Sequence, residues 1–443
     1  MIFSLAQAPP LESPPEAESP PFALVEVILP YVWVFVAAWA VTFALTPIMR
    51  MIAQRAGVVD RPDAERKAHL KPVAYLGGVA VLAGWAAGAS ICYFGELGVN
   101  ARPLLMIALG AGVITIVGLI DDIFGTSPRV KFAGQLFAAA ALAGAEVGTK
   151  LAAGLLVALG GTLGFEPTDI PGFGGEVVFY DPSYWLGSVL VTILLVAGSN
   201  SMNLLDGLDG LATGVSAITA LGLTVISVAL AMGLYRGNPY SVDYDPLRLV
   251  LCMALLGAAL GFLPFNFNPA KIFLGDAGSM LLGYLCISNI LLFAEMGNAD
   301  SMALVLAGLI VYAVPVTDTS LAIIRRLAER RSVFSPDDHH IHHQLIRSGM
   351  SVKQAVLVLY GLSLIFAALG CAMIFTRLRF VAAVFLLMFG FVIYSAYKTS
   401  RRHRRLERER SEQAQSTSRS ASAAAPSSPA SGETPPAAST HQT

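Results

Sequence analysis

The sequence predicts an all-α integral membrane protein with about eleven transmembrane helices. Of its 443 residues, 55% are hydrophobic and 13% are charged, whereas a soluble domain has about 25% charged residues. The apolar residues form long continuous runs, and a helix needs about 20 of them to cross the hydrocarbon layer. A transmembrane β-barrel is disfavoured because its strands alternate apolar and polar residues over about ten positions.

Eleven apolar segments are predicted to span the membrane. Each is close to the length that a spanning helix requires and contains few charged residues. A further apolar stretch, 151–163, is assigned to a long outer loop at 150–183, in which residues 172–180 favour a hairpin. The predicted spans are 24–49, 73–94, 103–120, 132–149, 184–199, 211–233, 247–264, 279–296, 302–321, 355–375 and 378–397.

The basic residues predict the orientation of these spans. With the loops 50–71 and 322–354 and the segment 398–410 in the cytoplasm, 23 of the 29 Lys and Arg residues lie on that side. The odd number of spans then places the N-terminus outside and the C-terminus in the cytoplasm. Between two tails, residues 23–398 are predicted to form one transmembrane domain.

Both tails have compositions that cannot build a core. Residues 1–22 contain many Pro and Glu and lack the basic start of a signal peptide, so we expect a disordered outer tail. Residues 399–443 are basic and then rich in Ser, Ala and Pro, so we expect a disordered cytoplasmic tail. The four cysteines all fall inside apolar spans, which favours small core residues over a disulfide framework.

The acidic residues of the spans gather at one membrane face. Carboxylates near membrane depth are costly and mark functional or paired positions. Five together need a counter-charge, and Mg²⁺, which prefers oxygen ligands, is the natural one. Nearby basic residues make a diphosphate a better substrate than a bare cation. The five aspartates at predicted cytoplasmic span ends are Asp121, Asp122, Asp206, Asp209 and Asp276, and the basic residues are Lys67, Lys131 and Lys271.

Each of these features also has a structural interpretation. Asp206, Asp209 and Asp276 precede glycines or small residues and could cap helices. The pair Asp121-Asp122 could be solvated at a helix end. The pair Gly77-Gly78 either lets backbone N–H groups approach a phosphate or lets two helices pack closely.

A cluster of histidines follows the ninth predicted span. Residues 339, 340, 342 and 343 are all histidine, a density that is unusual for core residues. Zinc binding is a competing interpretation, although the carboxylates lie in other segments and no Cys joins them. Asp318 stays open between a structural role and support of the site.

A transporter is the main alternative from another functional class. Transporters place ionisable residues near mid-span, often in broken and symmetric helices. Here the acidic residues lie at span ends on one face, which favours an enzyme.

Five separated motifs resemble the polyprenyl-phosphate N-acetylhexosamine-1-phosphate transferases, relatives of phospho-N-acetylmuramoyl-pentapeptide transferase. They occur in family order between residues 40 and 375, on one predicted membrane face. The motifs are 60–69 (DRPDAERKAH) with Gly77-Gly78, Asp121-Asp122 with Lys131-Phe132, 203–210 (NLLDGLDG), 268–279 (NPAKIFLGDAGS) and 337–343 (DDHHIHH).

The resemblance implies roles for individual residues. Asp276 matches a metal-ligand position, with Asp122 and Asp206 as further expected ligands. Asp121 matches the position proposed to deprotonate the lipid phosphate or to act as nucleophile. The expected catalytic residues are Asp121, Asp122, Asp209 and His340. The expected substrate-binding residues are Lys67, His69, Lys131, Asn203, Asp206, Lys271, His342 and His343.

The resemblance also implies the reaction and its partners. A sugar-1-phosphate would pass from a UDP-N-acetylhexosamine, most simply UDP-N-acetylglucosamine, to undecaprenyl or another polyprenyl phosphate, with release of UMP. Mg²⁺ is the expected cofactor and Mn²⁺ an alternative ion, in a plasma-membrane enzyme whose site faces the cytoplasm. We expect no nucleic-acid partner, and a homodimer stays an open alternative.

The histidine motif distinguishes subfamilies. Its form, Asp-x-x-His-Ile-His-His, is similar to that of the N-acetylglucosamine-1-phosphate transferases that initiate cell-envelope polysaccharides. Two departures from the family pattern stand out: residues 74–75 read Ala-Tyr where relatives often have Pro and Arg, and the outer segment 150–183 is long. The first puts a substrate contact at 74–75 in doubt.

Overall fold

The computed structural model describes residues 24–60, 72–94, 97–164, 181–235, 246–295, 298–328, 330, 332, 340–388, 390–391 and 394. Its elements are α1 (Leu24–Ala56), β1 (Val59–Asp60), β2 (Val73–Ala74), α2 (Gly77–Phe94), α3 (Ala101–Phe124), α4 (Pro128–Gly144), α5 (Leu151–Leu163), α6 (Pro182–Leu205), α7 (Leu211–Ala231), α8 (Pro246–Asn266), α9 (Gly275–Leu291), η4 (Leu292–Ala294), α10 (Ala299–Val311), α11 (Ala313–Ala328), α12 (Ile341–Arg347) and α13 (Val352–Met373).

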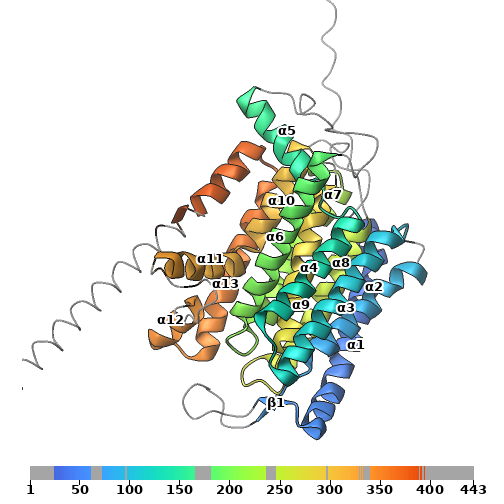
Figure 1. Cartoon of the computed structure of the whole chain (residues 1–443). Helices are drawn as coiled ribbons and strands as arrows, with labels where there is room; N and C mark the ends of the chain where they lie inside the picture. The colour runs from blue at the N-terminus through green and yellow to red at the C-terminus, as the bar shows by residue number, and fades with distance from the viewer. Residues whose placement is uncertain are drawn as a thin grey trace, which may run out of the picture.

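The helical membrane architecture is confirmed (Figure 1). Each of the eleven predicted spans overlaps a helix or a helix pair. The last of them, 378–397, overlaps the short apolar helix Leu378–Met388. Within the described residues, seven helices are long and apolar enough to cross a membrane, and the bent pair α10–α11 makes an eighth. The count of eleven spans and the orientation stay predictions.

The structure corrects two of the predicted segments. Residues 151–163, expected in a loop, form α5 and end at Gly164, whose φ of +79° lies in the left-handed region. The predicted span 302–321 is broken between α10 and α11, which meet at 77°. Pro315 explains the break, because it has no N–H and its ring would clash with the carbonyl of Val311. The two tails and the hairpin at 172–180 lie outside the described residues.

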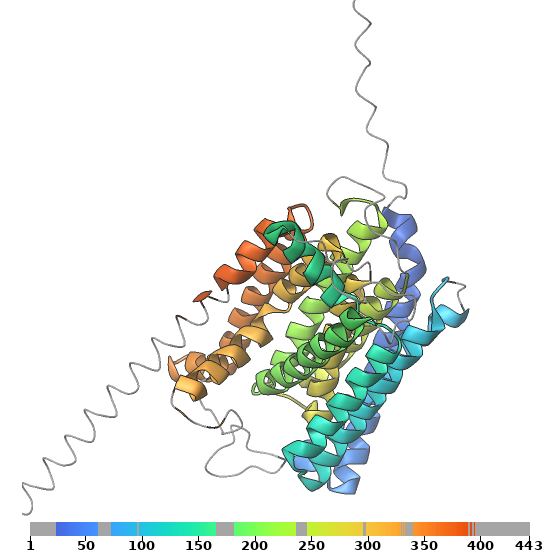
Figure 2. The same ribbon diagram turned by 45° about the horizontal axis from the view of Figure 1, so that its top comes forward.

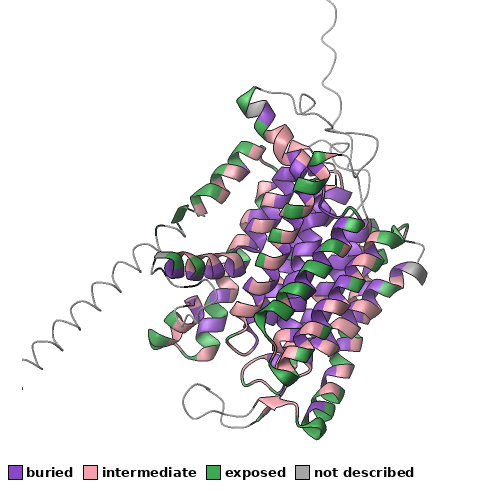
Figure 3. Ribbon diagram, in the orientation of Figure 1, coloured by how far each residue is buried: buried purple, intermediate pink, exposed green. Residues whose placement is uncertain are grey.

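Helix α9 is the centre of the molecule, and α2, α3, α6, α7 and α8 pack against it. Within Gly275–Ala294, the 18-residue apolar segment that is long enough to cross a membrane is entirely buried. Figure 3 shows the buried residues in the middle of the bundle and the exposed ones on its outer surface, and Figure 2 shows the same helices from a second direction. None of the four cysteines is in a disulfide, as predicted, and three of them are buried.

The start of α9 is held by the first motif. The N–H groups of Gly77 and Gly78 donate to the carbonyls of Phe273 and Leu274, both at 3.1 Å. A side chain at Gly78 would overlap the backbone of Gly278. The glycine pair therefore serves close packing of α2 against α9, the second of the two interpretations of this motif. Strands β1 and β2 pair antiparallel, and Ala74 bridges to Ile272 in the segment before α9.

A glycine in α3 permits equally close packing against α9. A Cβ atom on Gly118 would overlap the backbone of Asp276 and Ala277, whereas a Cβ atom on Gly112 in the same helix meets nothing within 4 Å. We expect Gly118→Ala to destabilise the protein by about 1–3 kcal/mol, because α3 and α9 must separate. Gly112→Ala should be neutral or stabilising. Thermal unfolding in detergent measures both, and equal stability of the two variants would contradict the packing argument.

Candidate active site

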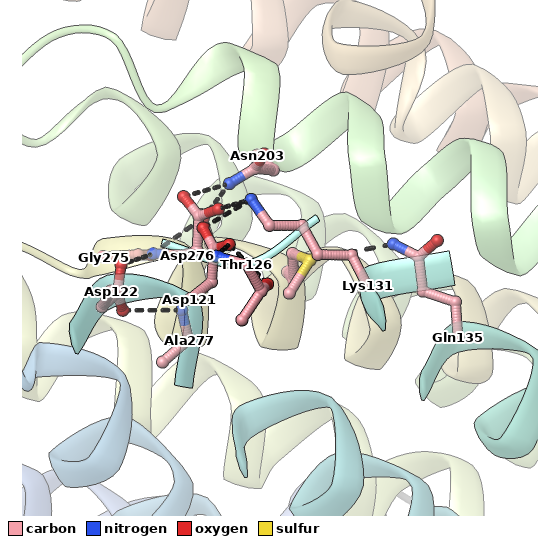
Figure 4. A network of polar contacts seen from close by, with 11 residues as sticks. Asp121, Asp122, Thr126, Lys131, Gln135, Asn203, Gly275, Asp276 and Ala277 are labelled. Atoms are coloured by element: carbon pink, nitrogen blue, oxygen red, sulfur yellow. Dashed lines mark hydrogen bonds and ion pairs between the residues drawn. The ribbon is translucent and has the colours of Figure 1, made fainter. Parts of the chain in front are cut away.

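Three helix ends bring a lysine and two aspartates together. Lys131 in the first turn of α4 lies between Asp121, at the end of α3, and Asp276, in the first turn of α9 (Figure 4). Its Nζ atom is 2.7 Å from Oδ2 of Asp121 and also bonds Oδ2 of Asp276. The side chains of Lys131, Asp121 and Asp276 keep 24%, 16% and 28% of their surface exposed, so a ligand can reach them.

Asn203, near the end of α6, completes this cluster. Its Nδ2 atom donates to Oδ1 of Asp276 at 3.0 Å and to the hydroxyl of Ser279 at 2.9 Å. One turn earlier in α6, Asn200 donates to Oε1 of Gln135 in α4 at 3.0 Å. The two contacts fix α6 against α4 and α9, so each oxygen of Asp276 has a defined partner.

Asp122 faces the backbone of α9. Its Oδ1 and Oδ2 atoms accept the N–H groups of Asp276, at 2.8 Å, and of Ala277, at 3.1 Å. These are two of the N–H groups that a helix start leaves without an internal partner. Asp122 thus caps α9 from a neighbouring helix and sets the position of Asp276. The sequence suggested that Asp276 could cap this helix, but in the structure Asp122 makes the cap.

Asp121 is held on both of its carboxylate oxygens. Oδ1 accepts the N–H of Thr126 at 2.8 Å and its hydroxyl at 2.7 Å, and Oδ2 faces Lys131. The turn after α3 makes this contact possible, because Gly125 ends the helix with a φ of +66°. Asp121 is therefore fixed in orientation at the edge of the cluster.

The loop between α6 and α7 contributes two further aspartates. Asp209 accepts from Nδ2 of Asn268 and from the N–H of Ala270, both at 2.9 Å, and so ties this loop to the segment before α9. Burial and the negative charges of Asp276, Asp122 and Asp209 raise the pKa of Asp206 to about 8. Asp206 thus lies in a strongly negative environment that a cation would relieve.

The histidine motif meets this loop at Gly207. His342 is 1% exposed, and its Nε2 atom lies against Gly207 so closely that a side chain there would overlap it. Burial, and then the neighbouring His343, lower the pKa of His342 to about 4, so its ring is neutral at pH 7. His340 and His342 stack with ring centroids 5.6 Å apart. The aspartate and histidine motifs therefore form one region.

Of the predicted substrate-binding residues, two cannot be placed against this network and a third, Lys271, is exposed. Lys67 and His69 lie outside the described residues, as does His339. Lys271 is exposed, and its backbone N–H donates to Phe265.

Several contributing residues were not predicted from the sequence. Thr126, Gln135 and Ser279 contact the cluster directly or support it. Tyr75 pairs with Asp60, and burial together with Asp60 raises the pKa of its phenol. The available signal was that Gln135 follows Lys131 by four residues and that Ser279, the last residue of the fourth motif, follows Asp276 by three, since positions three or four apart share a helix face.

Known proteins are similar to this chain over most of its length. Residues 104–294 match glycosyl transferase family 4. Decaprenyl-phosphate N-acetylglucosaminephosphotransferase of Mycobacterium tuberculosis is 36% identical over 374 residues, which cover 81% of this chain and 85% of the relative. The probable undecaprenyl-phosphate N-acetylglucosaminyl 1-phosphate transferase of Bacillus subtilis is 34% identical, covering 75% and 82%. The undecaprenyl-phosphate α-N-acetylglucosaminyl 1-phosphate transferase of Escherichia coli K12 is 28% identical, covering 81% and 90%.

The helical membrane fold and a polar site built at helix ends define a multi-pass membrane transferase. The chain belongs to glycosyl transferase family 4, in the group of the polyprenyl-phosphate N-acetylglucosamine-1-phosphate transferases.

Proposed function

We propose that the chain transfers N-acetylglucosamine-1-phosphate from UDP-N-acetylglucosamine to polyprenyl phosphate, giving polyprenyl diphosphate-N-acetylglucosamine and UMP. This reaction initiates the synthesis of a cell-envelope polysaccharide. The proposal depends on one observation above all: Lys131, Asp121, Asp276 and Asn203 form a single polar cluster at the ends of apolar helices. The relatives named above act on decaprenyl or undecaprenyl phosphate.

The oxygen ligands of the cluster fit Mg²⁺. Within the described residues, no three His, Cys, Asp or Glu side chains converge on a metal position. Mg²⁺ does not need such a set, because it takes one or two carboxylates and completes its shell with water and substrate phosphate. Asp276 and Asp206 would supply these carboxylates. When bound, the ion would stabilise negative charge on the diphosphate.

Asp122 and His340 already contact other groups of the protein, and these contacts limit the roles that they can have. Asp122, expected as a third ligand, has both oxygens on backbone N–H groups of α9, so we assign it to the placement of Asp276. The partners of Asp276 are the side chains of Lys131 and Asn203, and its own side chain is 28% exposed, so it stays an expected ligand. Nδ1 of His340 faces Asp318, so its other ring nitrogen, Nε2, is the one left for a ligand.

We expect metal removal to stop the reaction. Treating the purified protein with EDTA should abolish UMP release, and added Mg²⁺ should restore it, with Mn²⁺ as a weaker or equal substitute. The physical reason is the uncompensated charge of the diphosphate beside the aspartate cluster. Full activity in EDTA, with metal content checked by elemental analysis, would contradict the assignment of Asp276 and Asp206.

The chemistry is a direct displacement at phosphorus. An oxygen of the lipid phosphate forms a bond to the β-phosphorus that bears the sugar, and the bond from that phosphorus to the bridging oxygen breaks. UMP leaves with the electron pair. The second pKa of a phosphate monoester is near 6, so the attacking phosphate is mostly dianionic at pH 7 and needs little help from a base.

The residues of the cluster then orient and neutralise the reactants. Asp121 has Thr126 on one oxygen and Lys131 on the other, which supports a positioning role over that of a free nucleophile. Lys131 carries the positive charge nearest to Asp276 and would also face the transferred phosphate. His342, whose ring nitrogens are both buried, would support the loop at Gly207 beside Asp206 and thereby the placement of that aspartate.

A donor panel tests the function. Purified protein with undecaprenyl phosphate and Mg²⁺ is given UDP-N-acetylglucosamine, UDP-N-acetylgalactosamine, UDP-glucose or UDP-galactose, and UMP is quantified with and without lipid. We expect lipid-dependent UMP release with an N-acetylhexosamine donor. Absence of UMP with every N-acetylhexosamine donor would overturn the assignment.

We also propose that the cluster faces the cytoplasm, as the distribution of Lys and Arg predicts. The experiment is labelling of a single introduced cysteine at Lys271, an exposed position before α9, in a background without the native cysteines. A membrane-impermeant maleimide should label it in inverted vesicles and not in intact cells. Labelling in intact cells would reverse the orientation.

A further inference from the structure

Asp318 is a buried carboxylate that the transfer reaction described above does not use. It lies in α11 and is 1% exposed. The break at Pro315 turns α11 out of the direction of α10, and the hydroxyl of Tyr312 at the break donates to the carbonyl of Gly198 in α6 at 2.9 Å. The bend therefore places Asp318 where it meets the histidine motif.

Both oxygens of Asp318 contact this motif. Oδ2 is 2.8 Å from Nδ1 of His340, and Oδ1 accepts the N–H of Ile341 at 2.7 Å. A carboxylate only accepts hydrogen bonds, so Nδ1 of His340 carries a hydrogen atom. The other ring nitrogen, Nε2, is then the atom left to bind a substrate. The bond to Ile341 caps the first turn of α12.

Helix α12 depends on such an anchor because it has seven residues, and isolated helices shorter than about 12 residues are marginal. It carries His342, which packs on Gly207 beside Asp206, and His343, whose ring centroid is 4.2 Å from that of His342. A shift at the start of α12 would therefore displace these histidines from the loop between α6 and α7.

We propose that Asp318 is a positioning residue, which fixes the tautomer and orientation of His340 and anchors the start of α12. Its effect on catalysis is transmitted through His340, whose Nε2 atom is thereby presented to the diphosphate of the nucleotide sugar. This inference rests on the proposed transferase function. If the pair of Asp318 and His340 were purely structural, losing it would lower stability and leave the kinetics of the folded enzyme unchanged. A positioning role predicts instead that the kinetics change.

Asp318→Asn distinguishes these two roles. The amide oxygen can still accept from Ile341, whereas the amide NH₂ group faces Nδ1 of His340 and requires that nitrogen to accept, which moves the ring hydrogen to Nε2. We expect kcat/KM for UDP-N-acetylglucosamine to fall about 100-fold, with the KM for the lipid within about twofold of wild type. The matched control is Asp300→Asn at the start of α10, where the aspartate binds Tyr235, and its kinetics should be unchanged.

A double-mutant cycle shows whether Asp318 acts through His340. In a His340→Ala background, adding Asp318→Asn should change kcat/KM by less than about twofold, because the group through which it acts is already gone. If the two losses multiply, or if Asp318→Asn lowers the unfolding temperature with kcat/KM unchanged, the inference is wrong. Failure of the proposed function is distinct, because wild-type protein would then release no UMP.

The tautomer itself can be measured in the wild-type protein, independently of how the variant folds. Nitrogen NMR of ¹⁵N-histidine-labelled protein, with the signals of His340 assigned by their loss in His340→Ala, should show a protonated Nδ1. A ring of His340 that is protonated on Nε2 alone would overturn the proposal.

Discussion

Asp276→Asn is expected to lower kcat about a thousandfold and to abolish the response to Mg²⁺. The substitution removes the charge of an expected metal ligand, and metal stabilisation of phosphoryl charge contributes several kcal/mol, at about 1.4 kcal/mol per tenfold in rate. It also leaves Lys131 with Asp121 as its remaining partner in the cluster. UMP release under saturating substrates, as a function of Mg²⁺ concentration, measures the effect.

The fold should survive this change. The backbone N–H of residue 276 still bonds to Asp122, and the amide oxygen of asparagine can still accept from Asn203. Thermal unfolding near the wild-type temperature is therefore the control. Asp300→Asn, an aspartate-to-asparagine change in the first turn of α10, is the matched variant. Turnover of Asp276→Asn within tenfold of wild type would refute the ligand assignment.

Lys131→Met is expected to lower kcat/KM for UDP-N-acetylglucosamine about 100-fold or more. Asp121 and Asp276 lose the cation between them, so their mutual repulsion increases and the transferred phosphate loses a positive partner. Methionine retains most of the length of the side chain, so packing changes little. Steady-state kinetics with each substrate varied in turn measures the loss.

Two variants test whether the position of the charge matters. Lys131→Arg keeps the charge and should recover part of the activity, although the larger guanidinium fits the two carboxylates differently. Lys150→Met, at the exposed start of α5, removes a lysine outside the cluster and should leave kcat/KM unchanged. Equal kinetics of Lys131→Met and Lys150→Met would exclude a specific role for Lys131.

The fold was largely predictable because apolar runs and basic loops are strong local signals. Each predicted span corresponds to helical structure, and the errors arose where a local signal is weak. At 151–163 the distribution of charged residues favours a loop, whereas the apolar composition suits the helix that the structure shows. The break between α10 and α11 could have been expected from Pro315, but apolar residues on both sides of it resemble one continuous span.

The clustering of the candidate residues was easier to predict than the contacts that each of them makes. Asp121, Asn203, Asp276 and Lys131 come together as expected from their motifs. That Asp122 would cap α9 could not be predicted, because it requires the relative placement of α3 and α9. For Asp318 the sequence left a structural and a supporting role open, since its contact with His340 crosses 22 residues and depends on the bend at Pro315.

The most direct test of the account is a single-turnover experiment with UDP-N-acetylglucosamine carrying ³²P in its β-phosphate. The enzyme is mixed with this donor and Mg²⁺, polyprenyl phosphate is added, and protein, lipid and nucleotide fractions are counted over time. We predict that the label passes to the lipid with one UMP released per label transferred, that no label is bound to protein at any time, and that Asp276→Asn transfers none. Protein-bound label that forms and decays as fast as lipid product appears would contradict direct transfer, and UMP release without labelled lipid would contradict the function itself.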